Sequence, residues 1–180
     1  MPPLLGELAA RLPPEPPVWL VGGAVRDLLL GRPVQDVDLV VPRDALRLAR
    51  RLADEIGAAF VPLDEERGVA RVVWERGEID VADFRAGDLA QDLRARDLTI
   101  NAMALALHGE EAPSRDDVVD PWGGLADLEA GIVRLLGPEV LADDPLRTLR
   151  AVRIAAQLGF TIEPRSLGWI RCCAARRARP

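Results

Sequence analysis

Apolar residues recur along this chain at two spacings, one typical of strands and one typical of helices. Val18–Val21 is a short continuous apolar run, which favours a buried strand. Asp36–Val41 alternates in polarity and is rich in β-branched residues, so it also predicts a strand. Arg43–Ile56 instead repeats its apolar residues at helical spacing, and we expect an amphipathic helix there.

The same patterns place further elements in the first half of the chain. Residues 4–12 are expected to form a short helix that ends at the proline-rich residues 13–17. Gly22-Gly23 opens a second helix, which Gly31 ends as a C-cap. Three strands are predicted at Ala59–Leu63, Val69–Trp74 and Glu78–Phe84, with residues 75–77 joining the last two as a hairpin.

The second half is predicted to be mainly helical. The expected elements are a buried helix over Leu98–Leu107, a turn over 120–124, a strand at Ile132–Leu136, a long helix over Ala142–Leu158, and the short segment Thr161–Glu163 before a final helix. Helices and strands follow one another without a regular β-α-β order, so the sequence favours an α+β fold with a small mixed sheet. The last helices are expected to leave that layer and begin a helical segment.

The residue inventory narrows the chemistry that the chain can perform. It contains no lysine, which excludes a P-loop lysine, a Schiff-base lysine and a lysine general base. The single histidine, His108, ends an apolar run, which favours a surface position over a role in a Ser-His-Asp triad. Cys172 and Cys173 are neighbours and lack the spacing of a structural zinc site. Carboxylates, arginines and glycine turns remain, and they indicate metal-dependent phosphate chemistry.

The distribution of apolar residues and the N-terminal sequence indicate the cellular location of the protein. The chain is 49% hydrophobic, yet no apolar run approaches the roughly 20 residues of a membrane helix. The first residues have neither a basic start nor a long apolar stretch, so they do not resemble a secretion signal. We therefore expect a cytoplasmic protein that does not enter a membrane.

Charge is distributed unevenly along the chain. From Arg147 to Pro180 there are eight arginines and one acid, a net charge of +7, which leaves −13 for residues 1–146 of the total of −6. An acidic body followed by an arginine-rich end is typical of proteins whose end binds polyanions. A solvated helix face explains the same charges, and charge alone does not separate these interpretations.

The segment 22–41 carries the strongest chemical signal. Asp36 and Asp38 are two residues apart in a predicted strand, so their side chains share one face at a Cα separation of roughly 6–7 Å. Two ionised carboxylates on one face repel each other unless a cation lies between them, and Mg²⁺ prefers such ligands. Upstream, Gly22-Gly23 opens a helix whose N–H groups can bind phosphate, and Arg26 can add a charged contact. The alternative is a glycine turn, a capped helix and an acidic strand edge without a ligand.

A third carboxylate would complete a two-metal site. Asp80 lies on the face of its predicted strand opposite Ile79 and Val81. A neighbouring antiparallel strand could place Asp80 beside Asp36 and Asp38. Glu78 and Asp83 are other candidates for the third carboxylate. Alternatively, Asp80 is an exposed acid on the strand that binds no metal.

Four segments in order resemble one enzyme family. The run GGAVRD followed by DVD, within residues 22–38, resembles the first motif of the class II tRNA nucleotidyltransferase and poly(A) polymerase family. DLRARDLTINAMAL at 92–105 resembles its nucleotide-contacting motif, and DPWGGLADLEAGIVRLLG at 120–137 resembles its hinge segment. DDPLRTLRAVRIAAQLGFTIEP at 143–164 resembles the motif that reads the incoming base. The similarity covers about residues 18–166.

This resemblance implies a role for each matching residue. Asp36 and Asp38 would hold Mg²⁺ with Asp80 as the third acid, and Gly22, Gly23 and Arg26 would hold the triphosphate. Arg96 and Asp97 would position the nucleotide, Asp144 and Arg147 would bind the base edge, and Arg150 and Arg153 would support that face or the phosphates. Without the resemblance, Asp144-Pro145 also reads as the N-terminus of a capped amphipathic helix.

The resemblance also implies an architecture and a reaction. Residues 1–137 would form a nucleotidyltransferase head similar to that of DNA polymerase β, and 138–180 would begin an all-α neck. The enzyme would add CMP or AMP, from CTP or ATP, to the 3′ end of an RNA such as tRNA and release pyrophosphate, without an obligate protein partner. The short link 85–92 resembles members that add only CC or only A. Transfer to a non-RNA acceptor and an inactive nucleotide- or RNA-binding remnant are the alternatives.

Overall fold

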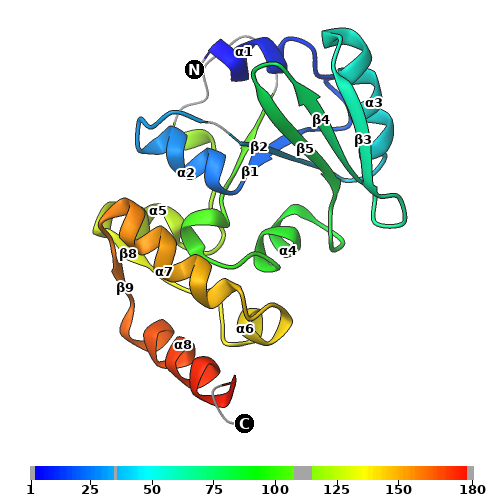
Figure 1. The fold of residues 1–180 in the computed structure, drawn as a ribbon. Helices are drawn as coiled ribbons and strands as arrows, with labels where there is room; N and C mark the ends of the chain where they lie inside the picture. Colours follow the sequence, from blue (N-terminus) through cyan, green and yellow to red (C-terminus); the bar gives the residue numbers. More distant parts are fainter. Residues whose placement is uncertain (1–2, 35, 108–114, 178–180) are drawn as a thin grey trace. The chain divides into compact units, whose positions relative to one another are not determined.

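Seven short strands form a mixed sheet in the first of the two units into which the chain divides (Figure 1). The structure, a computed structural model, describes residues 3–34, 36–107 and 115–177. The first unit comprises Met1–Leu93 and Ala104–Val119, and the second comprises Arg94–Met103 and Asp120–Pro180. The mixed sheet confirms the α+β fold class that the sequence predicts.

The sheet has the strand order β3-β4-β5-β2-β1-β6-β7. Its strands are β1 (Trp19–Val21), β2 (Val37–Val41), β3 (Ala59–Asp64), β4 (Val69–Trp74), β5 (Gly77–Asp83), β6 (Ala104–Ala106) and β7 (Val118–Val119). All neighbouring strands are antiparallel except β2 and β5, which are parallel. The predicted hairpin of β4 and β5 is confirmed.

Helices cover this sheet and connect its strands. They are α1 (Pro3–Ala9), α2 (Gly23–Leu29), α3 (Ala45–Ile56) and α4 (Leu89–Arg94), with a short 3₁₀ turn, η2 (Arg115–Asp117), before β7. The helix α3 packs against β3, β4 and β5 with the buried residues Ala49 and Leu52. Facing side chains such as Val72, Ile79 and Val81 are at most 2% exposed and form the core on that side.

The second unit is mostly helical. Its elements are η1 (a 3₁₀ helix, Thr99–Asn101), α5 (Gly124–Ala130), β8 (Ile132–Val133), α6 (Glu139–Asp143), α7 (Arg147–Leu158), β9 (Thr161–Ile162) and α8 (Pro164–Arg177). The strands β8 and β9 pair in parallel as a separate small sheet. The division into units does not test the predicted head (1–137) and neck (138–180), so that boundary stays a prediction.

The predicted helix over Leu98–Leu107 is wrong. This segment forms η1 and then β6, and β6 pairs with β1 through partners such as Leu20 and Leu105. A continuous apolar run is compatible with either a buried helix or a buried strand, and periodicity does not distinguish them. The free edge of β1 decides the conformation, because pairing with β6 satisfies backbone groups that would otherwise be buried.

The predicted long helix over Ala142–Leu158 is also wrong, because it is two helices. The helix α6 ends at Asp143, and α7 begins at Arg147. Pro145 has no N–H to donate and disfavours helical geometry in the residue before it. Asp144 accordingly takes an extended conformation, with φ −146° and ψ 102°. None of the helices in the described part of the chain has the length and apolar character that spanning a membrane requires.

Candidate active site

Three charged side chains lie on one row across β4, β5 and β2. Arg71 is the register partner of Asp80, and Asp80 is the register partner of Asp38. Register partners on adjacent strands point to the same face, and all three alternate with buried core residues. Asp36 lies in the bend directly before β2 and is exposed. The structure therefore places Asp38 and Asp80 side by side on one face, and Asp36 lies two residues before Asp38 in the chain.

The orientation of the strand that carries Asp80 differs from the prediction. We expected an antiparallel neighbour, but β5 runs parallel to β2. The chain leaves β2 through α3 and then reverses between β3, β4 and β5, so β5 returns in the direction of β2. Asp80 nevertheless lies beside Asp38, as expected, because the two residues are register partners in the parallel pair.

Arg71 is a member of this row that the sequence analysis missed. Its Nε donates to Oδ1 of Asp80 at 2.7 Å, and its Nη2 donates to Oδ2 at 2.9 Å. Its Nη1 forms an ion pair with Glu78. The hydrogen bonds to Asp80 and the charge of that carboxylate raise the pKa of Arg71, and the charges of Glu78 and Asp36 add to this effect. The hairpin register of β4 and β5 is the signal that could have found it.

Glu78 and Asp83, the alternatives to Asp80 as the third acid, have other partners. Glu78 is bound to Arg71. Oδ1 of Asp83 accepts a hydrogen bond from the backbone N of Ala45 at 2.8 Å, so Asp83 caps the first turn of α3. Gly68, at φ +62°, leaves room for Asp83, because a Cβ at residue 68 would lie 2.1 Å from its Oδ2. Asp80 is thus the acid on β5 that is in register with Asp38.

The donor set fits a hard divalent cation in its chemistry. Asp36 and Asp38 offer carboxylate oxygens, which are the ligands that Mg²⁺ prefers. Both carboxylate oxygens of Asp80 are bonded to Arg71. Within the described ranges, no three acidic, histidine or cysteine side chains lie close enough together to hold a metal ion.

The glycine turn follows the strand beside the acids. Val21, the last residue of β1, is the register partner of Asp38, and Gly22 comes directly after it. Gly22 has φ 74° and ψ −142°, a conformation essentially restricted to glycine. Gly23 lies against Arg26, since a Cβ there would be 3.3 Å from the Nη2 of Arg26. Arg26 donates to both carboxylate oxygens of Asp27, at 3.0 and 2.8 Å.

A second group of predicted residues lies around Asp97. This side chain is only 7% exposed and forms an ion pair with Arg150, with 2.8 Å between Oδ2 and Nε. Its Oδ1 also accepts from the backbone N of Leu98 at 2.9 Å and from Nδ2 of Asn101 at 3.2 Å. Arg150 is therefore a direct partner of the Arg96-Asp97 segment.

The other predicted residues of this group differ in their surroundings. Arg147 lies near the same segment, with its Nη2 3.5 Å from the backbone O of Ala95. Asp144 is not part of the helix α7, and its Oδ1 accepts from the backbone N of Leu146 at 2.9 Å. Arg153 is exposed, and its Nη1 lies 3.5 Å from Oε1 of Gln157. Of the predicted residues in α7, Arg147 and Arg150 thus lie beside residues 95–97. His108 and Arg179 lie outside the described residues.

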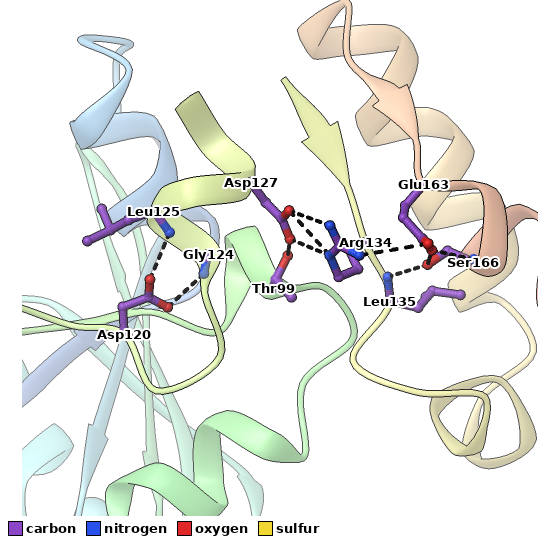
Figure 2. A network of polar contacts seen from close by, with 9 residues as sticks. All are labelled: Thr99, Asp120, Gly124, Leu125, Asp127, Arg134, Leu135, Glu163 and Ser166. Atoms are coloured by element: carbon purple, nitrogen blue, oxygen red, sulfur yellow. Dashed lines mark hydrogen bonds and ion pairs between the residues drawn. The ribbon is translucent and has the colours of Figure 1, made fainter. Parts of the chain in front are cut away.

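A polar network that the sequence analysis missed holds the segment next to Asp97. Figure 2 shows Asp127 between Thr99 and Arg134: it accepts from Oγ1 of Thr99 at 2.7 Å and from Nε of Arg134 at 2.9 Å. Arg134 also approaches Glu163 at 3.8 Å, and Glu163 accepts from the hydroxyl of Ser166 at 2.9 Å. These residues are 67 positions apart at the extremes, and no local pattern relates them.

Backbone hydrogen bonds connect the segment of Arg134 to the segment of Asp97. The backbone N of Thr99 donates to the O of Arg134 at 3.0 Å, and the N of Leu136 donates to the O of Asp97 at 3.1 Å. Asp120 caps the helix α5 that carries Asp127, accepting from the backbone N of Gly124 at 2.7 Å and of Leu125 at 2.9 Å (Figure 2). The network fixes the backbone on which Asp97 lies.

Comparisons with known proteins show similarity over most of the chain. Residues 18–89 and 86–134 match the profile of the poly(A) polymerase head domain. The chain is 46% identical over 154 residues to a CC-adding tRNA nucleotidyltransferase of Geobacter sulfurreducens, covering 84% of this chain and 34% of the relative. It is 43% identical over 165 residues to an A-adding tRNA nucleotidyltransferase of Deinococcus radiodurans, covering 91% of this chain and 36% of the relative.

Solved structures give the same result. A tRNA nucleotidyltransferase complexed with a primer tRNA and an incoming ATP analog has a TM-score of 0.78 and 34% identity, over 95% of this chain and 50% of that one. A tRNA-processing enzyme with CTP has a TM-score of 0.79 and 35% identity, over 94% of this chain and 45% of that one. The chain spans about a third of the length of the two curated relatives, 34% and 36%.

Proposed function

The chain belongs to the poly(A) polymerase head domain family, and from this premise we propose that it transfers CMP or AMP from CTP or ATP to the 3′ end of tRNA. The observation that carries the proposal is the row of acids beside the glycine turn, with Asp38 opposite Asp80 and Gly22 following the partner of Asp38. The names of the similar proteins support the substrate class, since they include CC-adding and A-adding tRNA nucleotidyltransferases.

In this proposal the first unit holds the reacting phosphates. Asp36 and Asp38 hold Mg²⁺, with Asp80 as the third acid, and Gly22, Gly23 and Arg26 hold the triphosphate. When bound, Mg²⁺ neutralises phosphate charge and favours ionisation of the attacking 3′-hydroxyl. The conformation of Gly22 turns the chain from β1 into α2, so that backbone N–H groups at the start of the helix are available to phosphate oxygens.

The reaction is a displacement at the α-phosphorus. The 3′-oxygen of the RNA forms a new bond to the α-phosphorus, and the bond from that phosphorus to the bridging oxygen of pyrophosphate breaks. The proton of the hydroxyl goes to solvent and pyrophosphate leaves. Arg26 contributes positive charge near the departing phosphates, which stabilises charge that develops during transfer.

The residues around Asp97 select and position the nucleotide in this proposal. Arg96 and Asp97 bind the nucleotide, and Asp144 and Arg147 offer acceptors and donors to the base edge. The ion pair between Arg150 and Asp97 supports the role that the resemblance implies for Arg150. Arg153, which is exposed, supports that face or the phosphates. We keep residues 1–137 as the catalytic head and 138–180 as the start of a helical neck.

Nucleotide addition tests this proposal directly. The purified chain is incubated with Mg²⁺, labelled CTP or ATP, and tRNAs that end before CCA, after C and after CC. We expect extension of at least one acceptor, and its loss in Asp36→Ala and Asp38→Ala but not in Glu66→Gln, an exposed residue in the turn before β4. Nucleotide binding without extension of any tRNA, or transfer to a non-RNA acceptor only, would overturn it.

A further inference from the structure

We propose that Arg71 is a positioning residue that holds Asp80 in place and competes with the divalent cation for its carboxylate. The inference rests on the proposed function, because it takes the acids of β2 and β5 as the cation-binding side chains. It adds a residue of β4, so that cation binding includes an exchange of partners at Asp80.

The geometry shows a complete pairing between Arg71 and Asp80. The guanidinium uses two N–H groups in a fork on both carboxylate oxygens, at 2.7 and 2.9 Å. This bidentate form is the strongest and most directional pairing between arginine and a carboxylate. A cation that takes an oxygen of Asp80 must therefore replace at least one of these hydrogen bonds.

The charges around Arg71 explain why such a residue is needed. Asp38 and Asp80 are register partners on adjacent strands, and like charges directly opposite each other destabilise a sheet. Asp36 adds a third negative charge that acts on Arg71. Arg71 neutralises part of this cluster when no cation is bound, and its positive charge repels a cation that approaches the same oxygens.

A second partner allows Arg71 to release Asp80. Its Nη1 is already paired with Glu78, so the side chain stays neutralised when the bonds to Asp80 break. The side chains of Arg71 and Asp80 are 35% and 34% exposed, so a cation reaches Asp80 from solvent without opening the core. We infer that Arg71 remains on Glu78 while Asp80 turns to the cation.

Cation binding measured without any nucleotide transfer tests this exchange. Mn²⁺ is titrated into the full chain by calorimetry, for the wild type and for Arg71→Gln, Arg71→Lys and the control Arg67→Gln. Arg67 is 85% exposed and pairs with Asp64 in the turn before β4. We expect about tenfold tighter Mn²⁺ binding in Arg71→Gln, as estimated for removing one charge about 5 Å from a divalent ion in water. Arg71→Lys keeps the charge and loses the fork, so its affinity should lie between the two, and Arg67→Gln should bind as the wild type does.

Each outcome separates this inference from the proposed function. Unchanged or weaker Mn²⁺ binding in Arg71→Gln, with a wild-type circular dichroism spectrum, overturns the competition even if Asp38→Asn abolishes binding and the enzyme extends tRNA. If Arg71→Gln does not fold, Arg71→Lys decides, and an affinity equal to that of the wild type overturns the inference. Tighter binding in Arg71→Gln together with no extension of any nucleic acid supports the competition and contradicts the proposed function.

Discussion

The acids of this chain differ in what they do because they differ in their partners. Asp38 and Asp80 face each other on a half-exposed sheet surface, whereas Asp83 caps a helix. Asp97 is buried and is held by Arg150 and by two neutral donors. A buried carboxylate with several donors is a fixed structural point, and the nucleotide contacts that we propose around Asp97 depend on its fixed position.

Arg150 should stabilise the fold through its ion pair with Asp97. Arg150→Gln should lower the free energy of unfolding by about 1 kcal/mol, because the buried carboxylate of Asp97 loses its charged partner. Arg153→Gln, three residues along the same helix, loses only a long contact with Gln157 and should change it by less than about 0.5 kcal/mol. Urea unfolding of both variants measures the difference. Equal stabilities would show that the ion pair with Asp97 contributes nothing.

Some helices and strands of this chain follow from the local sequence pattern, and others depend on the rest of the fold. The hairpin of β4 and β5 follows from alternation around a turn, and the same alternation places Asp80 on the face opposite the buried residues Ile79 and Val81. The direction of β5 relative to β2 depends on the whole path through α3 and β3, which no local pattern contains. The segment 98–107 became η1 and β6 because the edge of β1 was available, and α6 and α7 separate at Pro145 because proline cannot continue the helix.

The carboxylate of Asp83 should stabilise the start of α3. Asp83→Ala should lower the free energy of unfolding by about 1 kcal/mol, because the backbone N of Ala45 loses its cap. Asp54→Ala, on the exposed side of the same helix, should change it by less than about 0.5 kcal/mol. Mn²⁺ affinity of Asp83→Ala should remain that of the wild type, since this acid serves the helix. Weaker Mn²⁺ binding with unchanged stability would instead favour Asp83 over Asp80 as the third acid.

The network that joins β8, β9 and α8 predicts a pH dependence. Burial raises the pKa of Glu163, but hydrogen bonds from Ser166 and from the backbone of Arg165, with the charge of Arg134, lower it to below its ordinary value. Since the folded pKa is the lower one, Glu163 stabilises the fold above the ordinary glutamate pKa of about 4.3. That contribution is lost as the pH falls through the folded value.

Glu163→Gln tests this dependence by comparison with the wild type. The variant should be less stable than the wild type at neutral pH, and the difference should shrink as the solution is acidified below about pH 4.3. Urea midpoints measured across this range give the result. A difference that stays constant or grows with acidification would contradict the assigned direction of the pKa.

At the scale of the whole molecule, charge and chemistry divide along the chain. Residues 1–146 carry −13 and include the acids of the sheet, whereas 147–180 carry +7. The sequence could predict this division and the motifs of the family, because both are linear features. It could not predict Arg71, the capping role of Asp83 or the network of Asp127 and Arg134, because these depend on residues that only the fold brings together.

We propose that this chain transfers a nucleotide to RNA through the acids on the sheet. The most direct measurement is single-turnover extension of a tRNA lacking CCA by labelled CTP in Mg²⁺, for the wild type and for Asp38→Asn, with ATP and a tRNA ending in CC as the parallel reaction. We expect the wild type to lengthen at least one of the two acceptors. Asp38→Asn should lower the rate of this extension at least about 100-fold, because metal-assisted charge stabilisation is lost. Equal rates in the two proteins, or no extension of either acceptor by the folded wild type, would contradict it.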